Sequence, residues 1–325
     1  MTTNRRLGFR CLCVLVCATG GARAAEPTVN VVRNREYVKR ESGPLAMDVY
    51  LPRGAGPFPG VLVVHGGAWT IGSRMQLASV ANALAEHGYT AAAISYRLAP
   101  KHTFPTQLDD CQAAVRWLRE HASEFKLDPT RIGGFGYSAG GQLVALLGTM
   151  NDGDYREEGV PADAPSARLQ AVVAGGAPCD FRVLPENSDL LSYWLGGTRG
   201  AKPEAYRVAS PAAFVSADDP PMFFFHGARD LLVPAHSPQR MVELLTDAGV
   251  AAQMHLIKDA GHIEALFDAE TMEMAMAFAD AHLKAGVTAS DAAAQEGGGE
   301  RSTGLTRADA PARLENSPSE ARDGE

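Results

Sequence analysis

The chain alternates between buried-strand and amphipathic-helix patterns, an order that few architectures accommodate. Short apolar runs rich in β-branched residues, suited to strands covered on both faces, recur along it. These runs cover residues 58–65, 89–96, 131–137, 169–174, 221–225 and 252–257. Between them apolar residues recur with helical spacing, as in residues 108–118. The alternation predicts an α/β fold with a mostly parallel central sheet and helices on both faces, preceded by antiparallel edge strands near Asn30 and at 45–51.

Length and charge limit the domain count and the kinds of partner. A chain of 325 residues with 46% apolar composition supplies one sizeable core, which we place in residues 25–285. The formal net charge of −8 indicates no nucleic-acid partner and no attraction to an anionic membrane. No apolar run approaches the roughly 20 residues that span a bilayer. We expect a protein without a stable membrane anchor once its leader is removed.

The leader is predicted at residues 1–24. Arg5, Arg6 and Arg10 form a cationic start, a short apolar stretch follows, and small residues at 22 and 24 suit cleavage before Ala25. This order is typical of a signal peptide rather than a buried first helix, and it predicts a secreted or periplasmic protein. The adjacent arginines leave Sec and Tat export both open.

Two later segments break the alternation. Residues 179–214 are longer than a usual connection, and we expect them to form a lid or a substrate-facing insertion. Residues 286–325 contain no aromatic residue and are rich in small and charged residues, so we expect a disordered C-terminal tail. Cys111 and Cys179 would remain after cleavage of the leader. We expect two buried thiols, although an oxidising compartment would permit one bridge.

A nucleophile is indicated by Gly136-Tyr137-Ser138-Ala139-Gly140, which lies between a predicted strand and a predicted helix. A sharp strand-to-helix turn forces the serine side chain out of the sheet. The flanking glycines are needed because the backbone crowds there. The alternative is a glycine-rich turn that only packs a helix.

A serine hydroxyl needs a base within hydrogen-bond reach and an acid to hold that base. Of nine histidines, His262 follows the last strand, where an open α/β sheet places its site. Asp230 lies in the turn after the aromatic strand, and Asp259 is a weaker rival beside the base. The order Ser138, Asp230, His262 is the one expected of α/β-hydrolases. We expect His226 to be a packed histidine with satisfied hydrogen bonds.

Acyl transfer also needs N–H donors aimed at the developing oxyanion. Ala139 follows the nucleophile directly and supplies one candidate. Gly66, Gly67 and Ala68 end the strand at residues 58–65 and supply the others, because two glycines let the backbone turn its N–H groups inward. Alone, this segment would be only a strand-ending turn.

Together these motifs resemble the hormone-sensitive-lipase-like and feruloyl-esterase-like (BD-FAE) carboxylesterases of the α/β-hydrolase superfamily. The matching segments are HGGAW (65–69), SYRLAPKHTFPTQLDD (95–110), GFGYSAGG (134–141), SPAAFVSADDPPMFFFHGARDLLVP (210–234) and DAGH (259–262). The resemblance implies the α/β-hydrolase fold and a serine esterase. It also implies Ser138 as nucleophile, His262 as base and Asp230 as acid, with the oxyanion hole near Gly66, Gly67, Ala68 and Ala139.

One departure bears on specificity. Lipase-like members commonly have a third glycine where Ala68 stands. The methyl group of Ala68 narrows the acyl pocket, which favours the feruloyl-esterase-like branch. We expect Trp69 and Tyr137 to line the substrate pocket. Arg97 and Asp110 belong to the family's structural signature, and we interpret them as an ion pair outside catalysis.

The sequence therefore predicts a serine carboxylesterase that hydrolyses short-chain acyl esters through an acyl-enzyme, on carbohydrate or plant-derived substrates. No metal and no cofactor are expected. Two alternatives stay open: a serine amidohydrolase, either an exopeptidase or an arylformamidase, and a catalytically dead binding scaffold. The acyl group, the alcohol and the oligomeric state are left undetermined.

Overall fold

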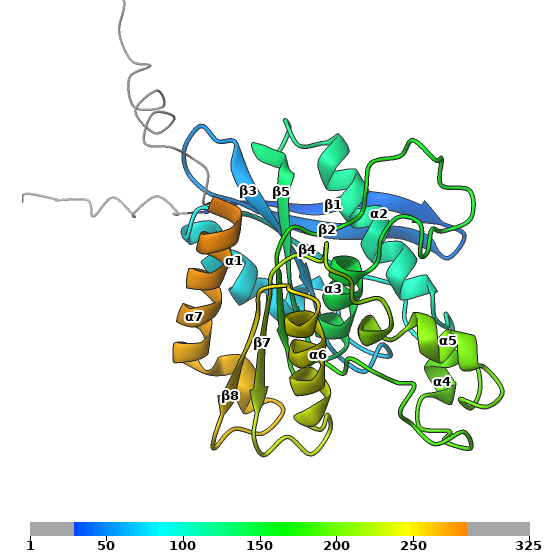
Figure 1. Ribbon diagram of the computed structural model, residues 1–325. Helices are drawn as coiled ribbons and strands as arrows, with labels where there is room; N and C mark the ends of the chain where they lie inside the picture. Colours follow the sequence, from blue (N-terminus) through cyan, green and yellow to red (C-terminus); the bar gives the residue numbers. More distant parts are fainter. Residues whose placement is uncertain (1–28, 285–325) are drawn as a thin grey trace, which may run out of the picture. The chain divides into compact units, whose positions relative to one another are not determined.

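The computed structural model describes residues 29–284, which build one eight-stranded sheet (Figure 1). The strand order is β1-β2-β4-β3-β5-β6-β7-β8, antiparallel from β1 to β4 and parallel from β4 to β8. The strands are β1 (Asn30–Arg40), β2 (Gly43–Leu51), β3 (Phe58–Val64), β4 (Thr90–Ile94), β5 (Leu127–Tyr137), β6 (Val172–Gly175), β7 (Met222–Gly227) and β8 (Ala252–Ile257). The segments predicted as signal peptide and tail, 1–24 and 286–325, lie outside the described residues.

Helices cover both faces of this sheet, as the alternation predicts. α1 and α7 pack on one face, whereas α2, α3 and α6 pack on the other, so each face has its own apolar core (Figure 1). The bounds are α1 (Ala78–Glu86), α2 (Thr106–Glu120), α3 (Ala139–Thr149), α6 (His236–Asp247) and α7 (Ala269–Ala279). The α/β-hydrolase architecture is therefore confirmed.

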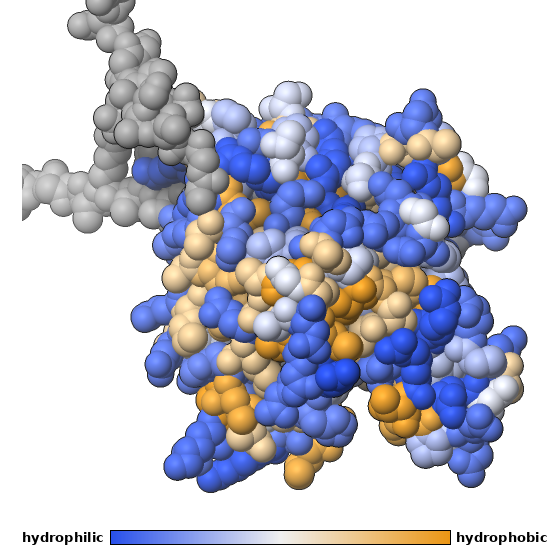
Figure 2. Space-filling view, in the orientation of Figure 1, coloured by the Kyte–Doolittle hydropathy of each residue, from blue (hydrophilic) through white to orange (hydrophobic). Residues whose placement is uncertain are grey.

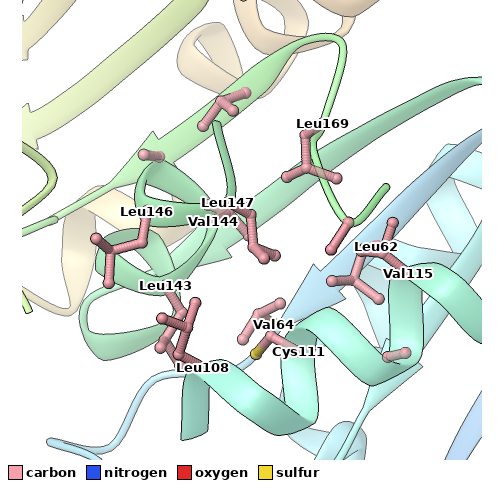
Figure 3. Close-up of a cluster of buried hydrophobic side chains, with 14 of the residues drawn as sticks. Leu62, Val64, Leu108, Cys111, Val115, Leu143, Val144, Leu146, Leu147 and Leu169 are labelled. Atoms are coloured by element: carbon pink, nitrogen blue, oxygen red, sulfur yellow. The ribbon is translucent and has the colours of Figure 1, made fainter. Parts of the chain in front are cut away.

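The two cores meet the sheet through alternate residues of its central strands. In β3, Leu62 and Val64 join the core under α2 and α3, while Val61 and Val63 join the core under α1 and α7. Successive side chains of a strand point to opposite faces, so a strand covered on both sides is apolar throughout. Figure 3 shows leucine and valine side chains of β3, α2 and α3 converging on one of these cores.

The prediction of two edge strands is correct for β1 and wrong for β2. β2 lies between β1 and β4, and its Met47 and Val49 are fully buried. Asp48 made the segment look half exposed, yet this carboxylate is buried. It accepts hydrogen bonds from the Asn34 backbone N–H at 2.8 Å and from Arg74 Nε at 2.9 Å. A polar residue can be buried when its hydrogen bonds are satisfied, and the sequence alone does not distinguish it from an exposed one.

Three smaller expectations can be checked in the described residues. Cys111 and Cys179 are both free and buried, as expected. Arg97 donates from Nε and Nη2 to the buried Asp110 at 2.9 and 2.7 Å, so the predicted ion pair is present. Across residues 29–284, no helix combines the length and the apolar composition that crossing a bilayer requires.

The carboxyl ends of the parallel strands meet at one edge of the sheet, where β7 and β8 end in Figure 1. Figure 2 shows separate hydrophobic patches at this end of the molecule, between hydrophilic areas. Apolar side chains that are more than half exposed lie in its loops: Leu231, Leu232, Ile263 and Phe267. In an open α/β sheet this edge is where ligands bind.

Candidate active site

Ser138 occupies the sharp turn between β5 and α3, with φ 56° and ψ −120°. A non-glycine residue is held there only when the surroundings enforce the geometry. The flanking glycines explain how the turn closes. A Cβ on Gly136 would lie 2.2 Å from the Gly140 carbonyl oxygen, and one on Gly140 would lie 2.0 Å from that of Val64. Any side chain at either position would therefore push the strand and the helix apart.

The predicted acid, base and nucleophile converge. Ser138 Oγ lies 2.9 Å from His262 Nε2, and His262 Nδ1 lies 2.6 Å from Asp230 Oδ2. The carboxylate requires a hydrogen on Nδ1, which leaves Nε2 free to accept the serine hydroxyl proton. Both supporting side chains are withdrawn from solvent, with 8% of His262 and 1% of Asp230 exposed. The row is set to transfer a proton from the hydroxyl to the imidazole.

Asp230 is held by the turn that carries it. Its Oδ1 accepts backbone hydrogen bonds from Leu232 at 2.8 Å and from Val233 at 2.9 Å. Such bonds fix the carboxylate where it can stabilise an imidazolium at His262. The rival Asp259 is about 71% exposed and pairs with Arg229, so it is not the orienting acid.

His226 contradicts the expectation of a satisfied, merely packed histidine. Its side chain is fully buried in β7, and its Nε2 lies 3.1 Å from Asp230 Oδ2. Its Nδ1 has no hydrogen-bond partner among the described residues. Sequence reasoning missed this contact because strand periodicity explains a buried histidine without assigning it a partner. The spacing His226-x-x-x-Asp230 across a tight turn was the available signal.

The expected oxyanion donors lie beside the nucleophile. A Cβ on Gly66 would stand 3.1 Å from Ser138 Cβ, which brings this loop against the reactive side chain. The backbone N–H groups of Gly67, Ala68 and Ala139 donate to no acceptor within residues 29–284. Free N–H groups next to a nucleophile are what a developing oxyanion requires. The Gly66 N–H likewise donates to no acceptor within the described residues, and this residue is buried against the nucleophile's own turn.

His65 fixes the start of this loop. Its ring stacks on Tyr96 with centroids 4.2 Å apart, and its Nδ1–H donates to the Gly66 carbonyl oxygen at 2.7 Å. Burial lowers the pKa of His65 to about 4, so the ring is neutral near pH 7. A neutral ring keeps positive charge out of the core under the loop.

Trp69 and Tyr137, expected in the substrate pocket, both make other contacts. Trp69 is 4% exposed, stacks on Trp194 and donates from Nε1 to Gln142 Oε1 at 3.0 Å. Tyr137 is 4% exposed and donates its hydroxyl to the His262 backbone oxygen. Both side chains therefore brace catalytic loops, and a role in the pocket stays a prediction.

The insertion at 179–214 reaches the oxyanion loop through aromatic rings. It contains α4 (Ser192–Leu195) and α5 (Pro203–Val208). Trp194 of α4 lies flat on Trp69, with centroids 3.6 Å apart and an interplanar angle of 4°. The Tyr193 hydroxyl donates to the Ala68 carbonyl oxygen at 3.2 Å. The insertion thus lies against residues 68 and 69, and its role as a lid or a substrate-facing segment stays a prediction.

Comparison with known proteins gives a consistent set of relatives. The BD-FAE family model matches residues 47–245. Esterase LipC of Mycobacterium tuberculosis is 32% identical over 73% of this chain, and the probable carboxylic ester hydrolase LipM of the same organism is 36% identical over 58%. The chain spans 62% of the length of the first and 45% of the second.

Solved structures agree on the fold. A truncated carbohydrate esterase from gut microbiota superposes with a TM-score of 0.71 and 25% identity, over 80% of this chain and 99% of that one. The butyrate-bound esterase Est2 of Thermogutta terrifontis superposes with a TM-score of 0.65 and 26% identity, over 78% of this chain and 93% of that one.

Proposed function

Because this chain belongs to the BD-FAE family and has the α/β-hydrolase fold, we propose that it is a serine carboxylesterase acting through Ser138, His262 and Asp230. The observation that carries the proposal is the row of hydrogen bonds from hydroxyl to imidazole to carboxylate, at 2.9 and 2.6 Å. The esterase names of the relatives support ester hydrolysis as the reaction.

In the first half-reaction Ser138 Oγ attacks the ester carbonyl carbon while its proton moves to His262 Nε2. Asp230 stabilises the resulting imidazolium across the 2.6 Å contact to Nδ1. His262 then returns the proton to the departing alcohol, which leaves the acyl group on the serine. The turn holds the carboxylate in place during both transfers, because Oδ1 accepts two backbone hydrogen bonds from it.

The tetrahedral intermediate places negative charge on the former carbonyl oxygen. The unpaired N–H groups of Gly67, Ala68 and Ala139 are the donors we assign to it. In the second half-reaction a water molecule attacks the acyl-enzyme, and His262 takes its proton. The acid product then leaves, and the serine hydroxyl is restored.

We propose that the substrates are short-chain acyl esters of carbohydrate or plant-derived alcohols. One feature of the sequence supports a small acyl group: Ala68 adds a methyl group to the loop that follows β3. The structural relatives include a carbohydrate esterase and a butyrate-bound esterase, which supports the same class.

The test compares Ser138→Ala with the wild-type protein on p-nitrophenyl esters from acetyl to lauryl and on acetylated xylan. We expect loss of hydrolysis in Ser138→Ala, and a steep fall in the wild-type rate beyond butyryl. Ser42→Ala, at an exposed turn, is the matched control and keeps full activity. Retained turnover in Ser138→Ala would refute the nucleophile, and equal rates on all chain lengths would refute the small acyl site.

We also propose export, on the strength of the charge and apolar pattern of residues 1–24. Cell fractionation and N-terminal sequencing of the mature protein test it. We expect a mature chain beginning near Ala25 outside the cytoplasm. An intact Met1 on cytoplasmic protein would contradict the proposal.

A further inference from the structure

We propose that His226 is a positioning residue, a second imidazole whose Nε2–H lies against the Asp230 carboxylate and helps to hold it in line with His262. The inference rests on the proposed function, since it concerns how the catalytic base is supported. It adds a fourth side chain to the row of three.

The position of the hydrogen on His226 follows from its neighbours. Nε2 lies 2.8 Å from the Val233 carbonyl oxygen and 3.1 Å from Asp230 Oδ2. Both of these oxygens only accept, so Nε2 must carry a hydrogen. The N–H donates to the Val233 carbonyl oxygen, and the Asp230 carboxylate lies beside the same N–H as a close electrostatic contact. The imidazole is thereby anchored to the turn after β7 at two points.

The opposite edge of the ring shows that His226 is neutral. Its Nδ1 is buried and has no partner among residues 29–284, so a second hydrogen there would be an unpaired donor. Burial and the nearby His262 both lower the pKa of His226, and these effects outweigh the attraction of Asp230. His226 therefore offers the carboxylate an N–H dipole rather than a positive charge.

With His226 included, both oxygens of Asp230 are held by close neighbours. Oδ1 accepts from two backbone N–H groups, Oδ2 accepts from His262, and His226 Nε2 lies 3.1 Å from Oδ2. Rotation about its terminal bond would break these contacts together, which keeps Oδ2 aimed at His262 Nδ1.

The charges around this cluster determine what a pH profile can report. The titratable or charged groups nearby are Asp230, His262, Tyr137, Glu264, Arg229 and Asp259. Burial raises the pKa of Tyr137, which leaves it neutral, and Arg229 pairs with Asp259 in solvent. His262 is thus the group whose protonation His226 influences through Asp230.

Two variants separate positioning from packing. His226→Phe keeps a planar ring but removes the donor, whereas His226→Gln replaces the ring yet keeps an N–H near the Nε2 position. Without the donor, more negative charge of Asp230 faces His262, so the imidazolium becomes easier to form. The acidic limb of the kcat/KM profile then moves to higher pH.

For His226→Phe we expect a fall in kcat of about tenfold with KM unchanged, and a shift of the acidic limb by about half a pH unit. His226→Gln restores most of kcat and the original limb. His255→Phe is the control, because it makes the same substitution in the adjacent strand β8. A folded His226→Phe protein with the wild-type kcat and pH profile would overturn the inference.

A measurement on the unmodified protein covers the case in which His226→Phe does not fold. Long-range ¹H–¹⁵N NMR of histidine-labelled protein reports the tautomer of each ring. We expect His226 to be neutral with its hydrogen on Nε2 at pH 7. A hydrogen on Nδ1 or a cation would overturn the proposal. This readout needs no turnover, so it stays informative if the wild-type protein hydrolyses no ester and the proposed function fails.

Discussion

Replacing Trp194 by alanine removes the ring that lies flat on Trp69, next to the oxyanion loop. Trp194 is fully buried. Its ring meets Phe104 and Phe181 edge-on, with centroids 5.3 and 5.5 Å away, and its Nε1 donates to Gln107 Oε1 at 3.0 Å. The variant therefore tests two things: how much Trp194 stabilises the insertion at residues 179–214, and whether the insertion keeps the loop at Trp69 in its conformation.

The effect on stability follows from burial. Truncating a fully buried tryptophan to alanine costs about 3–5 kcal/mol through lost transfer free energy and the cavity left behind. For a domain of this size each kcal/mol shifts Tm by about 2–4 °C. We therefore expect Tm of Trp194→Ala to fall by about 6–20 °C, within what a folded protein tolerates.

The effect on activity follows from backbone strain. Ala68 and Trp69 have φ values of 49° and 59°, in the left-handed region. Each such residue costs of order 1–3 kcal/mol and persists only where its surroundings hold it. Without the stack on Trp194 the loop relaxes, and the Ala68 N–H leaves the oxyanion position. Loss of one such donor lowers kcat by about 10²–10³-fold.

The assay measures thermal unfolding together with kcat and KM on p-nitrophenyl acetate. Trp194→Phe is the matched variant, because it keeps an aromatic stack and removes only the Nε1–H and part of the ring. We expect kcat of Trp194→Phe to stay within about tenfold of wild type. A Trp194→Ala protein with lowered Tm but unchanged kcat would refute the reasoning, because the loop would then hold its geometry without the insertion.

Two further predictions concern the backbone and pH. Gly140→Ala should destabilise the protein by at least about 3 kcal/mol, because its Cβ would lie 2.0 Å from a carbonyl oxygen. Gly153→Ala meets nothing within 4 Å and should leave the urea midpoint unchanged; equal midpoints for both variants would contradict the crowding argument. Burial lowers the pKa of His65 to about 4, below its unfolded value of about 6.5, so the unfolded chain binds more protons between these values. This contribution to stability is complete above pH 6.5 and falls by about 2 kcal/mol at pH 5. His65→Gln should show a flatter dependence of urea midpoint on pH, and an unchanged slope would count against the assignment.

Local patterns predicted much of the fold and part of the site. The order of strands and helices follows from apolar periodicity, which is written residue by residue. The turn at Ser138 could be predicted from its flanking glycines, although the crowding at Gly140 comes from Val64 in a distant strand. The order Ser138, Asp230, His262 could be predicted because each residue follows a strand, and the carboxyl ends of parallel strands lie at one edge of the sheet.

Contacts between distant segments could not be predicted in this way. Trp69 was expected in a pocket, but residue 194 covers it, and no local pattern links those two positions. His226 has the periodicity of any buried strand residue, and only the turn after β7 brings it to Asp230. β2 has a polar residue at its centre, and only pairing with β4 makes it interior. Periodicity specifies which face of an element is buried, whereas the packing of the whole sheet decides which side chain it is buried against.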